Sequence, residues 1–488
     1  MPVGTLHELQ RATPESQGIA SAAVLRLVEA LESQTNELHS LMLLRHGSVV
    51  AEGWWSPYLP EQPHIVFSLS KSFTASAVGL AVSEGYFTLE SPVLSFFPDE
   101  APVDASDFLQ AMCVRHLLSM STGHTVDTWS NMFGRPDGNW IRGFFEVPVT
   151  QPPGTFFLYN TGATYMLAAI VERTTRMTVL DYLEPRLFAP LGIHGASWQQ
   201  SPEGITMGGI GLSLKTEDIA RFGQLYLQKG RWQGKQLLPE SWVEEATAIQ
   251  SINGDDPDSD WAQGYGFQFW RCRHGAYRGD GVFGQYCIVM PEQDAVLAIT
   301  GGVDLFEMQK PLDLIWEILL PAMGSEHPAE DAEAYQRMKV RLSGLQCPVV
   351  EGQADSLVGS RVSDRTYIVD DNALKLREIS FDFGAADCTI RLKTDSGDEV
   401  LPCGYGTWLP GQTTLFNDEW VVGVTPVMTC GAWTAEDVFT LVVRLVETPF
   451  VHTLGFHFLD SELLIQTQVN VSFEAPEAQL LSAHHKNS

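Results

Sequence analysis

Residues 68–82 read SLSKSFTASAVGLAV, and apolar or small side chains follow one another through almost all of this segment. A helix without a polar face is a buried helix, so we expect one here. Ser68 and Lys71 would share one face of that helix. A serine hydroxyl becomes a nucleophile when a neighbour takes its proton, and a lysine can do so when burial favours its neutral form. The two residues are therefore a candidate catalytic pair, although Ser-x-x-Lys alone also arises by chance.

The length, charge and cysteine content limit the class of protein. A chain of 488 residues is too long for one ordinary core, so we expect two domains. A formal charge of −30 argues against nucleic acid and anionic membranes as partners. Neither a secretory signal nor a membrane-spanning apolar run is visible, which predicts a cytoplasmic protein. The seven cysteines lack Cys-x-x-Cys spacing, which favours reduced, mostly buried thiols over disulfides or a zinc site.

The first two thirds of the chain mix helical and strand patterns. A helix is expected over 19–31, and residues 41–51 read as two strands about a His-Gly turn. Helical patterns dominate 68–230, and strand patterns return over 266–300. Strands on both sides of a helical middle predict an α+β domain, in which an antiparallel sheet is assembled from distant segments and helices pack on it.

The last third of the chain has a different pattern. Residues 1–325 are assigned to the α+β domain, and 326–350, a polar stretch with glycine and proline, to a linker region. Short alternating runs punctuated by Gly, Asp and Pro predict a smaller all-β C-terminal domain over 351–475, either a sandwich or a barrel. Residues 476–488 are expected to form a disordered tail.

Two further segments carry candidate functional residues. Residues 153–167 read PGTFFLYNTGATYML, in which a turn places Tyr159 just before an apolar helix. Residues 278–285 read RGDGVFGQ, at the expected start of a strand. Tyr159 alone would be interpreted as a buried ring that holds a turn. Together with Ser68-x-x-Lys71, and in this order, the segments resemble the serine β-lactamase and penicillin-binding-protein superfamily, particularly its class C-like esterase and D-aminopeptidase branch.

The resemblance spans about residues 12–322 and implies a β-lactamase-like serine hydrolase domain that needs neither a metal nor another cofactor. By this resemblance Ser68 is the nucleophile, while Lys71 and Tyr159 share its proton and return it to the leaving group. Which of the two is the base stays open. The backbone N–H groups of Ser68 and Val282 would form the oxyanion hole.

Three residues are candidates for substrate contact: Thr161, Asp280 and Gly281. Gly281 would let its strand come close to the site, and Thr161 stands where family members often have Asn. Gly279 and Asp280 replace the usual Lys-Thr or His-x pair, and the lost cation should disfavour anionic ligands. An Asp280 carboxylate facing the cleft would attract a substrate amino group. The alternative is that Asp280 pairs with Arg278 and never meets substrate.

Three functions are therefore weighed. The leading one is a metal-independent serine hydrolase, of esterase, amidase or aminopeptidase type, that cleaves a small ester or amide through an acyl-enzyme. A β-lactamase or D,D-peptidase is disfavoured by Gly279 and by the missing export signal. A non-catalytic binding or assembly protein would retain the fold and work through its β-rich domain. That domain could contact substrate, assemble a homo-oligomer or shield an edge.

Overall fold

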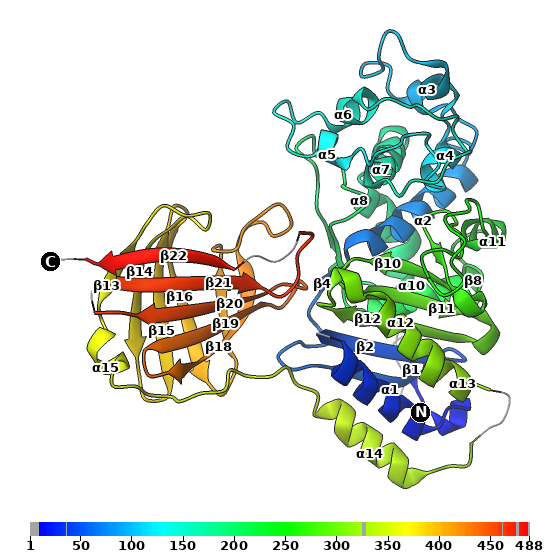
Figure 1. The fold of residues 1–488 in the computed structure, drawn as a ribbon. Coiled ribbons are helices and arrows are strands. Elements are labelled where there is room, and N and C mark those ends of the chain that lie inside the picture. Colours follow the sequence, from blue (N-terminus) through cyan, green and yellow to red (C-terminus); the bar gives the residue numbers. More distant parts are fainter. Residues whose placement is uncertain (1–8, 36, 325–327, 461, 475–477, 487–488) are drawn as a thin grey trace. The chain divides into compact units, whose positions relative to one another are not determined.

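The computed structural model describes residues 9–35, 37–324, 328–460, 462–474 and 478–486 (Figure 1). The chain divides into two compact units. The first unit extends to Gly344 and excludes the segments 54–62 and 302–306. The second unit consists of those two segments and the chain from Leu345 onward. The first unit is α+β, and the described residues of the second unit are mostly β-strand, as the sequence predicts.

A seven-stranded sheet forms the centre of the first unit (Figure 1). Its spatial order is β1 (Gln10–Arg11), β3 (Ser48–Trp54), β2 (Leu38–Arg45), β12 (Ala295–Gly301), β11 (Gln285–Met290), β10 (Tyr277–Gly281) and β9 (Trp270–Arg271). The turn between β2 and β3 is His46-Gly47, and both residues have positive φ. Because β2 pairs antiparallel with β12, the sheet joins the two ends of the unit. This confirms the predicted assembly from distant segments.

Helices surround this sheet. The α-helices of the first unit are α1 (Ser21–Gln34), α2 (Ser70–Ser83), α3 (Asp107–Ala111), α4 (Val114–Leu118), α5 (Trp129–Met132), α6 (Trp140–Glu146), α7 (Thr161–Thr175), α8 (Val179–Leu183), α9 (Ala189–Leu191), α10 (Thr216–Leu227), α11 (Glu240–Thr247), α12 (Gln309–Leu314), α13 (Leu320–Ala322) and α14 (Ala332–Ser343). Helix α10 packs on β2, β11 and β12. Gly223 makes this approach possible, since a Cβ there would lie 2.5 Å from Val296 Cγ1. Helix α2 packs against α7 and is buried from Ser70 to Ala81, as its composition predicts.

Short elements complete the first unit. The short helical turns are η1 (Glu15–Gln17), η2 (Phe67–Leu69), η3 (Val93–Phe96), η4 (Glu184–Phe188), η5 (Arg273–Gly275), η6 (Pro291–Gln293), η7 (Leu305–Glu307, in a segment grouped with the second unit) and η8 (Ile315–Leu319). Two small sheets consist of β4 (His64–Ile65), β6 (Leu212–Leu214) and β5 (Ser197–Trp198), and of β7 (Arg231–Trp232) and β8 (Lys235–Gln236). Strand β4 of the first small sheet comes just before η2 in the chain, and η2 contains Ser68.

The second unit is a closed β-barrel, one of the two architectures that the sequence allows. Its strands are β13 (Thr366–Val369), β14 (Leu376–Phe383), β15 (Asp387–Thr394), β16 (Gly397–Tyr405), β17 (Leu409–Thr413), β18 (Thr425–Ala435), β19 (Val438–Leu445), β20 (Val451–Phe458), β21 (Glu462–Val469) and β22 (Gln479–His485), with the helix α15 (Gly359–Val362). The sheet closes because β16 also pairs with β18, at Gly404 and Cys430. Alternate side chains of β15 are buried, as expected for a strand with one face toward a core.

Two segments differ from the sequence prediction. Within the expected linker 326–350, residues 332–343 form α14, which packs on α1 through Ala334, Met338 and Leu342. These side chains recur at the spacing of one helix face, a pattern that the polar composition obscured. Within the expected disordered tail, residues 479–485 form β22, which pairs with both β13 and β21. Residues 476–477 and 487–488 of that tail lie outside the described residues.

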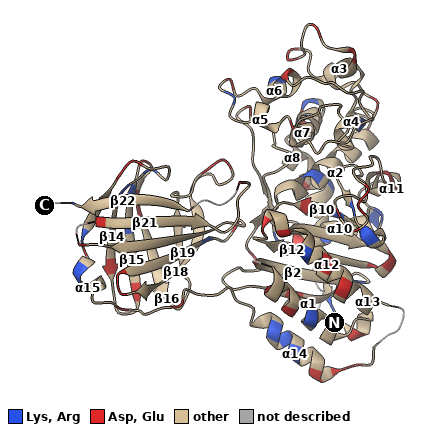
Figure 2. Cartoon of the chain, in the orientation of Figure 1, with Lys and Arg blue, Asp and Glu red and all other residues tan. Residues whose placement is uncertain are grey.

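Charge and thiols follow the composition. Acidic side chains are distributed over both units rather than gathered in one segment (Figure 2). All seven cysteines are buried and unbridged, as expected for reduced thiols. Among the described residues, no helix is long and apolar enough to cross a membrane.

Candidate active site

Ser68 and Lys71 meet at the start of the buried helix. Ser68 lies in η2 and Lys71 in the first turn of α2, and the Lys71 Nζ atom is 2.9 Å from Ser68 Oγ. Ser68 is half-buried, so its hydroxyl is open to a reactant. The spacing of the two residues in the sequence therefore predicts their contact correctly.

Lys71 is buried, with 1% of its surface exposed. Burial lowers the pKa of its ammonium group to about 7, although the negative charges of Asp127 and Asp280 oppose this shift. Its Nζ atom also contacts the Gly209 carbonyl oxygen at 2.9 Å and Thr161 Oγ1 at 3.4 Å. A Cβ at position 209 would lie 3.5 Å from Nζ and only 2.9 Å from Thr161 Cγ2, so glycine suits this close approach. At neutral pH, a large fraction of Lys71 is an unprotonated amine.

Tyr159 completes the group from the turn before α7. Its ring stacks on Trp270, with centroids 5.2 Å apart, and Lys71 Nζ lies 4.9 Å from the ring centroid. Burial raises the pKa of the Tyr159 phenol, while a hydrogen-bonding interaction with Ser68 lowers it by a smaller amount. The phenol therefore keeps its proton at neutral pH. The structure brings Ser68, Lys71, Tyr159 and Thr161 together from three distant parts of the chain.

Strand β10 ends against the backbone just before Ser68. A Cβ on Gly281 would lie 2.1 Å from the Val66 carbonyl oxygen, so only glycine allows this approach. Phe67 precedes Ser68 and Phe283 follows Val282; both are buried, and their rings pack edge to face at 5.7 Å. Both residues also have the positive φ that most residues avoid, 45° and 65°. The aromatic contact thus holds together the two backbone segments that carry the N–H groups of Ser68 and Val282.

The third motif lacks a cation for a steric reason. A Cβ on Gly279 would lie 2.2 Å from Leu69 Cδ1 and 3.0 Å from Ser72 Oγ. Leu69 therefore fills the space into which a longer side chain at position 279 would extend.

Asp280 lies in an ion pair. Arg278 Nε is 2.6 Å from Asp280 Oδ2, and the two side chains are 0% and 7% exposed. Burial raises the pKa of the Asp280 carboxyl group, and the charge of Arg278 opposes that rise. This contact is the pairing with Arg278 that the sequence allowed as an alternative.

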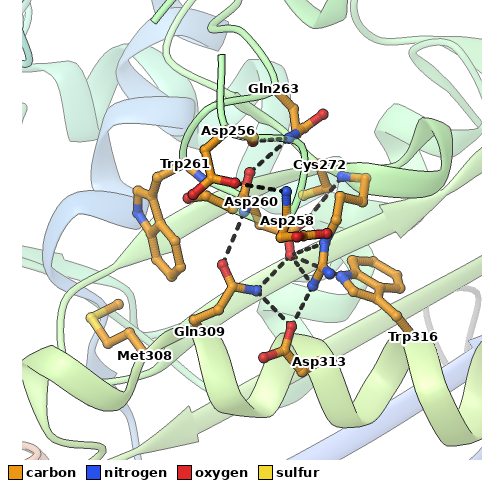
Figure 3. A network of polar contacts seen from close by, with 12 residues as sticks. Asp256, Asp258, Asp260, Trp261, Gln263, Cys272, Met308, Gln309, Asp313 and Trp316 are labelled. Atoms are coloured by element: carbon orange, nitrogen blue, oxygen red, sulfur yellow. Dashed lines mark hydrogen bonds and ion pairs between the residues drawn. The ribbon is translucent and has the colours of Figure 1, made fainter. Parts of the chain in front are cut away.

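A network of polar contacts is centred on Asp260 (Figure 3), whose backbone also contacts Arg278. The Asp260 carbonyl oxygen accepts from Arg278 Nη1 at 2.8 Å. The Asp260 carboxylate accepts from Arg273 Nη2 at 2.9 Å, Gln309 Nε2 at 2.7 Å and Trp316 Nε1 at 2.9 Å. This network connects the loop before β9 to α12 and η8. Through the contact between the Asp260 backbone and Arg278, it also fixes the position of β10.

Some residues near the site were not singled out by the sequence. Asn160 is buried, and its Oδ1 accepts from Thr128 Oγ1 at 2.8 Å, so it anchors a loop instead of facing substrate. Gly209 supplies a carbonyl acceptor for Lys71, and Asp127 acts electrostatically on both Lys71 and Tyr159. No local pattern marks Asp127, because its role depends on loops meeting in space. In the part of the chain that the structure describes, no cluster of His, Cys, Asp or Glu is arranged to hold a metal ion.

Comparison with known proteins places the chain in a family. Residues 11–310 match the family described as Beta-lactamase. The chain belongs to that family. Among relatives, it is 25% identical to the 6-aminohexanoate-dimer hydrolase of Paenarthrobacter ureafaciens, over 61% of this chain and 81% of that protein. It is 26% identical to the lovastatin esterase of Penicillium rubens, over 26% of this chain and 37% of that protein.

The barrel also has a counterpart in a beta-lactamase-fold protein. The structure of the octameric penicillin-binding protein homologue from Pyrococcus abyssi covers 94% of this chain and 99% of its own, with a TM-score of 0.50 and 16% identity. The likeness shows the fold of both units, whereas the family match covers the first. As a member of the beta-lactamase family with hydrolase relatives, the chain is a serine hydrolase.

Proposed function

We propose that this enzyme cleaves small esters or amides through an acyl-enzyme formed on Ser68. One observation carries the proposal: the Ser68 hydroxyl lies 2.9 Å from the amine of a buried lysine whose pKa falls to about 7. A neutral amine at that distance can accept the hydroxyl proton. The names of two relatives, a 6-aminohexanoate-dimer hydrolase and a lovastatin esterase, support amide and ester substrates respectively.

The contacts around Lys71 suit the role of base. A neutral amine has two N–H groups and one lone pair. The N–H groups are satisfied by the Gly209 carbonyl oxygen and Thr161 Oγ1, which leaves the lone pair for the Ser68 proton. Tyr159 does not serve as the base at neutral pH, because burial raises the pKa of its phenol and keeps the proton on it. We therefore assign proton removal from Ser68 to Lys71.

The remaining steps follow from the same groups. As Lys71 takes the proton, Ser68 Oγ bonds to the carbonyl carbon, and the carbonyl electron pair moves to the oxygen. The backbone N–H groups of Ser68 and Val282 stabilise this oxyanion. When the oxyanion collapses, the bond to the leaving group breaks, and the leaving group takes a proton from Tyr159. The Lys71 ammonium then returns a proton to Tyr159, and water releases the acyl group by the reverse sequence.

A β-lactamase or D,D-peptidase function is less well supported. A substrate carboxylate would need a cation at the third motif, and Leu69 leaves no space for one at position 279. The neighbouring cation Arg278 is buried and paired with Asp280. Hydrolysis of a chromogenic cephalosporin at rates matching those of simple esters would favour this second function.

A fluorophosphonate probe tests the proposal. It should label the native enzyme on Ser68, and Ser68→Ala should abolish both labelling and hydrolysis. Ser83→Ala, at the far end of α2, is the matched control and should label normally. Labelling that persists in Ser68→Ala would overturn the assignment of the nucleophile.

We further propose that the enzyme forms a homo-oligomer. The support is its similarity, over both units, to a Pyrococcus abyssi structure described as octameric. Light scattering coupled to size-exclusion chromatography measures the mass directly, and a monomer at micromolar concentration would contradict the proposal.

A further inference from the structure

The loop before α5 is fastened to the first turn of α7. Thr128 donates to Asn160 Oδ1 through its hydroxyl at 2.8 Å and its backbone N–H at 3.3 Å. A Cβ on Gly162 would lie 2.0 Å from Thr128 Oγ1, so glycine lets the loop come this close. The adjacent residue Asp127 is thereby placed over the start of α7, beside Thr161.

The carboxylate of Asp127 belongs to the electrostatic environment of the active site. Its Oδ1 accepts from the Trp129 N–H at 2.9 Å. Desolvation raises the pKa of its carboxyl group, and the backbone N–H groups of Trp129, Thr161 and Gly162 oppose that rise. Lys71 is the charged side chain that acts on it most strongly. Thr161 therefore contacts both groups: its backbone N–H acts on Asp127, and its Oγ1 is 3.4 Å from Lys71 Nζ.

The two acids near Lys71 differ in access. Asp280 is 7% exposed and held by Arg278, whereas Asp127 is exposed to solvent. A substrate can therefore reach Asp127 without breaking a buried ion pair. The overall charge of −30 also favours approach by cations over anions.

The charge balance changes when Lys71 works as a base. A neutral Lys71 no longer compensates the negative charge of the Asp127 carboxylate, and the nearby Tyr159 phenol is uncharged as well. A substrate ammonium group would restore the balance. On the basis of the hydrolase function proposed above, we propose that Asp127 binds the ammonium group of substrates that carry an amine near the scissile ester or amide, and so determines specificity.

This assignment has a kinetic consequence that a purely structural role lacks. The negative charge of Asp127 raises the pKa of Lys71. A bound ammonium group neutralises that charge, and so favours the unprotonated lysine in the complex. Amine-bearing substrates should therefore be cleaved well at slightly acidic pH, where neutral substrates are cleaved slowly.

The experiment compares p-nitroanilides of ω-amino acids of increasing length with their N-acetylated counterparts. The native enzyme should prefer the free amine at one or more lengths. Asp127→Asn should lower the ratio of kcat/KM for that amine to kcat/KM for its acetylated counterpart about tenfold or more. Asp127→Glu should restore part of the preference. Asp104→Asn, which removes an exposed acid from the same unit, is the matched control and should behave like the native enzyme.

Hydrolysis of a neutral ester distinguishes the amine-binding role of Asp127 from a loss of folded structure in the variant. With p-nitrophenyl butyrate, Asp127→Asn should move the acidic limb of the kcat/KM profile to lower pH, since the lysine loses a neighbour that raises its pKa. Three results would each overturn the role of Asp127. They are an equal fall in kcat/KM for both substrates, an unchanged amine preference in Asp127→Asn, and no amine preference in the native enzyme. The hydrolase function fails separately, if Ser68→Ala retains activity.

Discussion

Replacing Lys71 by methionine should stabilise the folded enzyme at neutral pH while abolishing its activity. A lysine whose pKa falls from 10.5 to about 7 on folding loses its proton more readily in the folded state. Between those values the unfolded chain binds more protons, so the stability of the native enzyme rises with pH across this window. Below pH 7 the full penalty of burying the amine is present.

The size of the effect follows from the shift. At about 1.4 kcal/mol for each pKa unit, burial of Lys71 costs roughly 4 kcal/mol at pH 7 and roughly 1 kcal/mol at pH 10. Methionine removes this cost but leaves the Gly209 carbonyl oxygen without its donor, which destabilises by about 2 kcal/mol. Lys71→Met should therefore be more stable than the native enzyme by about 2 kcal/mol at pH 7, and less stable by about 1 kcal/mol at pH 10.

Urea unfolding of both proteins at the two pH values measures this difference. Because the chain divides into two compact units, we expect two unfolding transitions, and the one that the substitution moves should belong to the first unit. Lys235→Met, at an exposed position, controls for the general effect of alkaline pH. A difference in stability that is the same at pH 7 and pH 10 would mean that Lys71 stays protonated in the folded enzyme, and would refute its role as the base.

Three shorter predictions concern the same site. The kcat/KM of the native enzyme for a neutral ester should rise with pH through about 7 and then level off, because the neutral form of Lys71 is the active one; a flat profile would contradict this. Gly281→Ala should lower kcat/KM about 100-fold or more, since the new Cβ displaces β10 from Val66 and with it an oxyanion donor; unchanged kinetics would show that β10 does not form the hole. Asp280→Asn should destabilise the enzyme by about 3 kcal/mol in urea unfolding, because the buried Arg278 loses its counter-charge, and stability equal to the native enzyme would contradict the ion pair.

Much of the fold could be predicted because local sequence patterns indicate its helices and strands. The hairpin of β2 and β3 follows from two strand-forming runs on either side of the His46-Gly47 turn. The convergence of Ser68, Lys71 and Tyr159 was predicted by the resemblance of three ordered motifs. Such motifs predict that distant residues converge, because the residues act together in one active-site geometry.

The elements that were missed depend on distant partners. Strand β22 is mostly polar and exposed, and it becomes a strand because β13 and β21 offer edges on both sides. Gln268 interrupts an expected strand with a φ of 63°, because its side chain bonds Thr164 and the carbonyl oxygens of Leu117 and Leu118. Asp127 was missed for the same reason, since only the packed loop shows what it faces.

The active site combines several unfavourable features that its surroundings must hold in place. Phe67 and Phe283 adopt φ values that cost about 1–3 kcal/mol each, and Lys71 is buried against its preference for water. None of these would persist in a loosely packed loop. Each of these residues is buried beside α2 and β10, where closely packed neighbours oppose relaxation. The stability of this unit is thus what keeps a lysine neutral and two backbone donors aligned, and substitutions that relax the site should stabilise the protein at the expense of its chemistry.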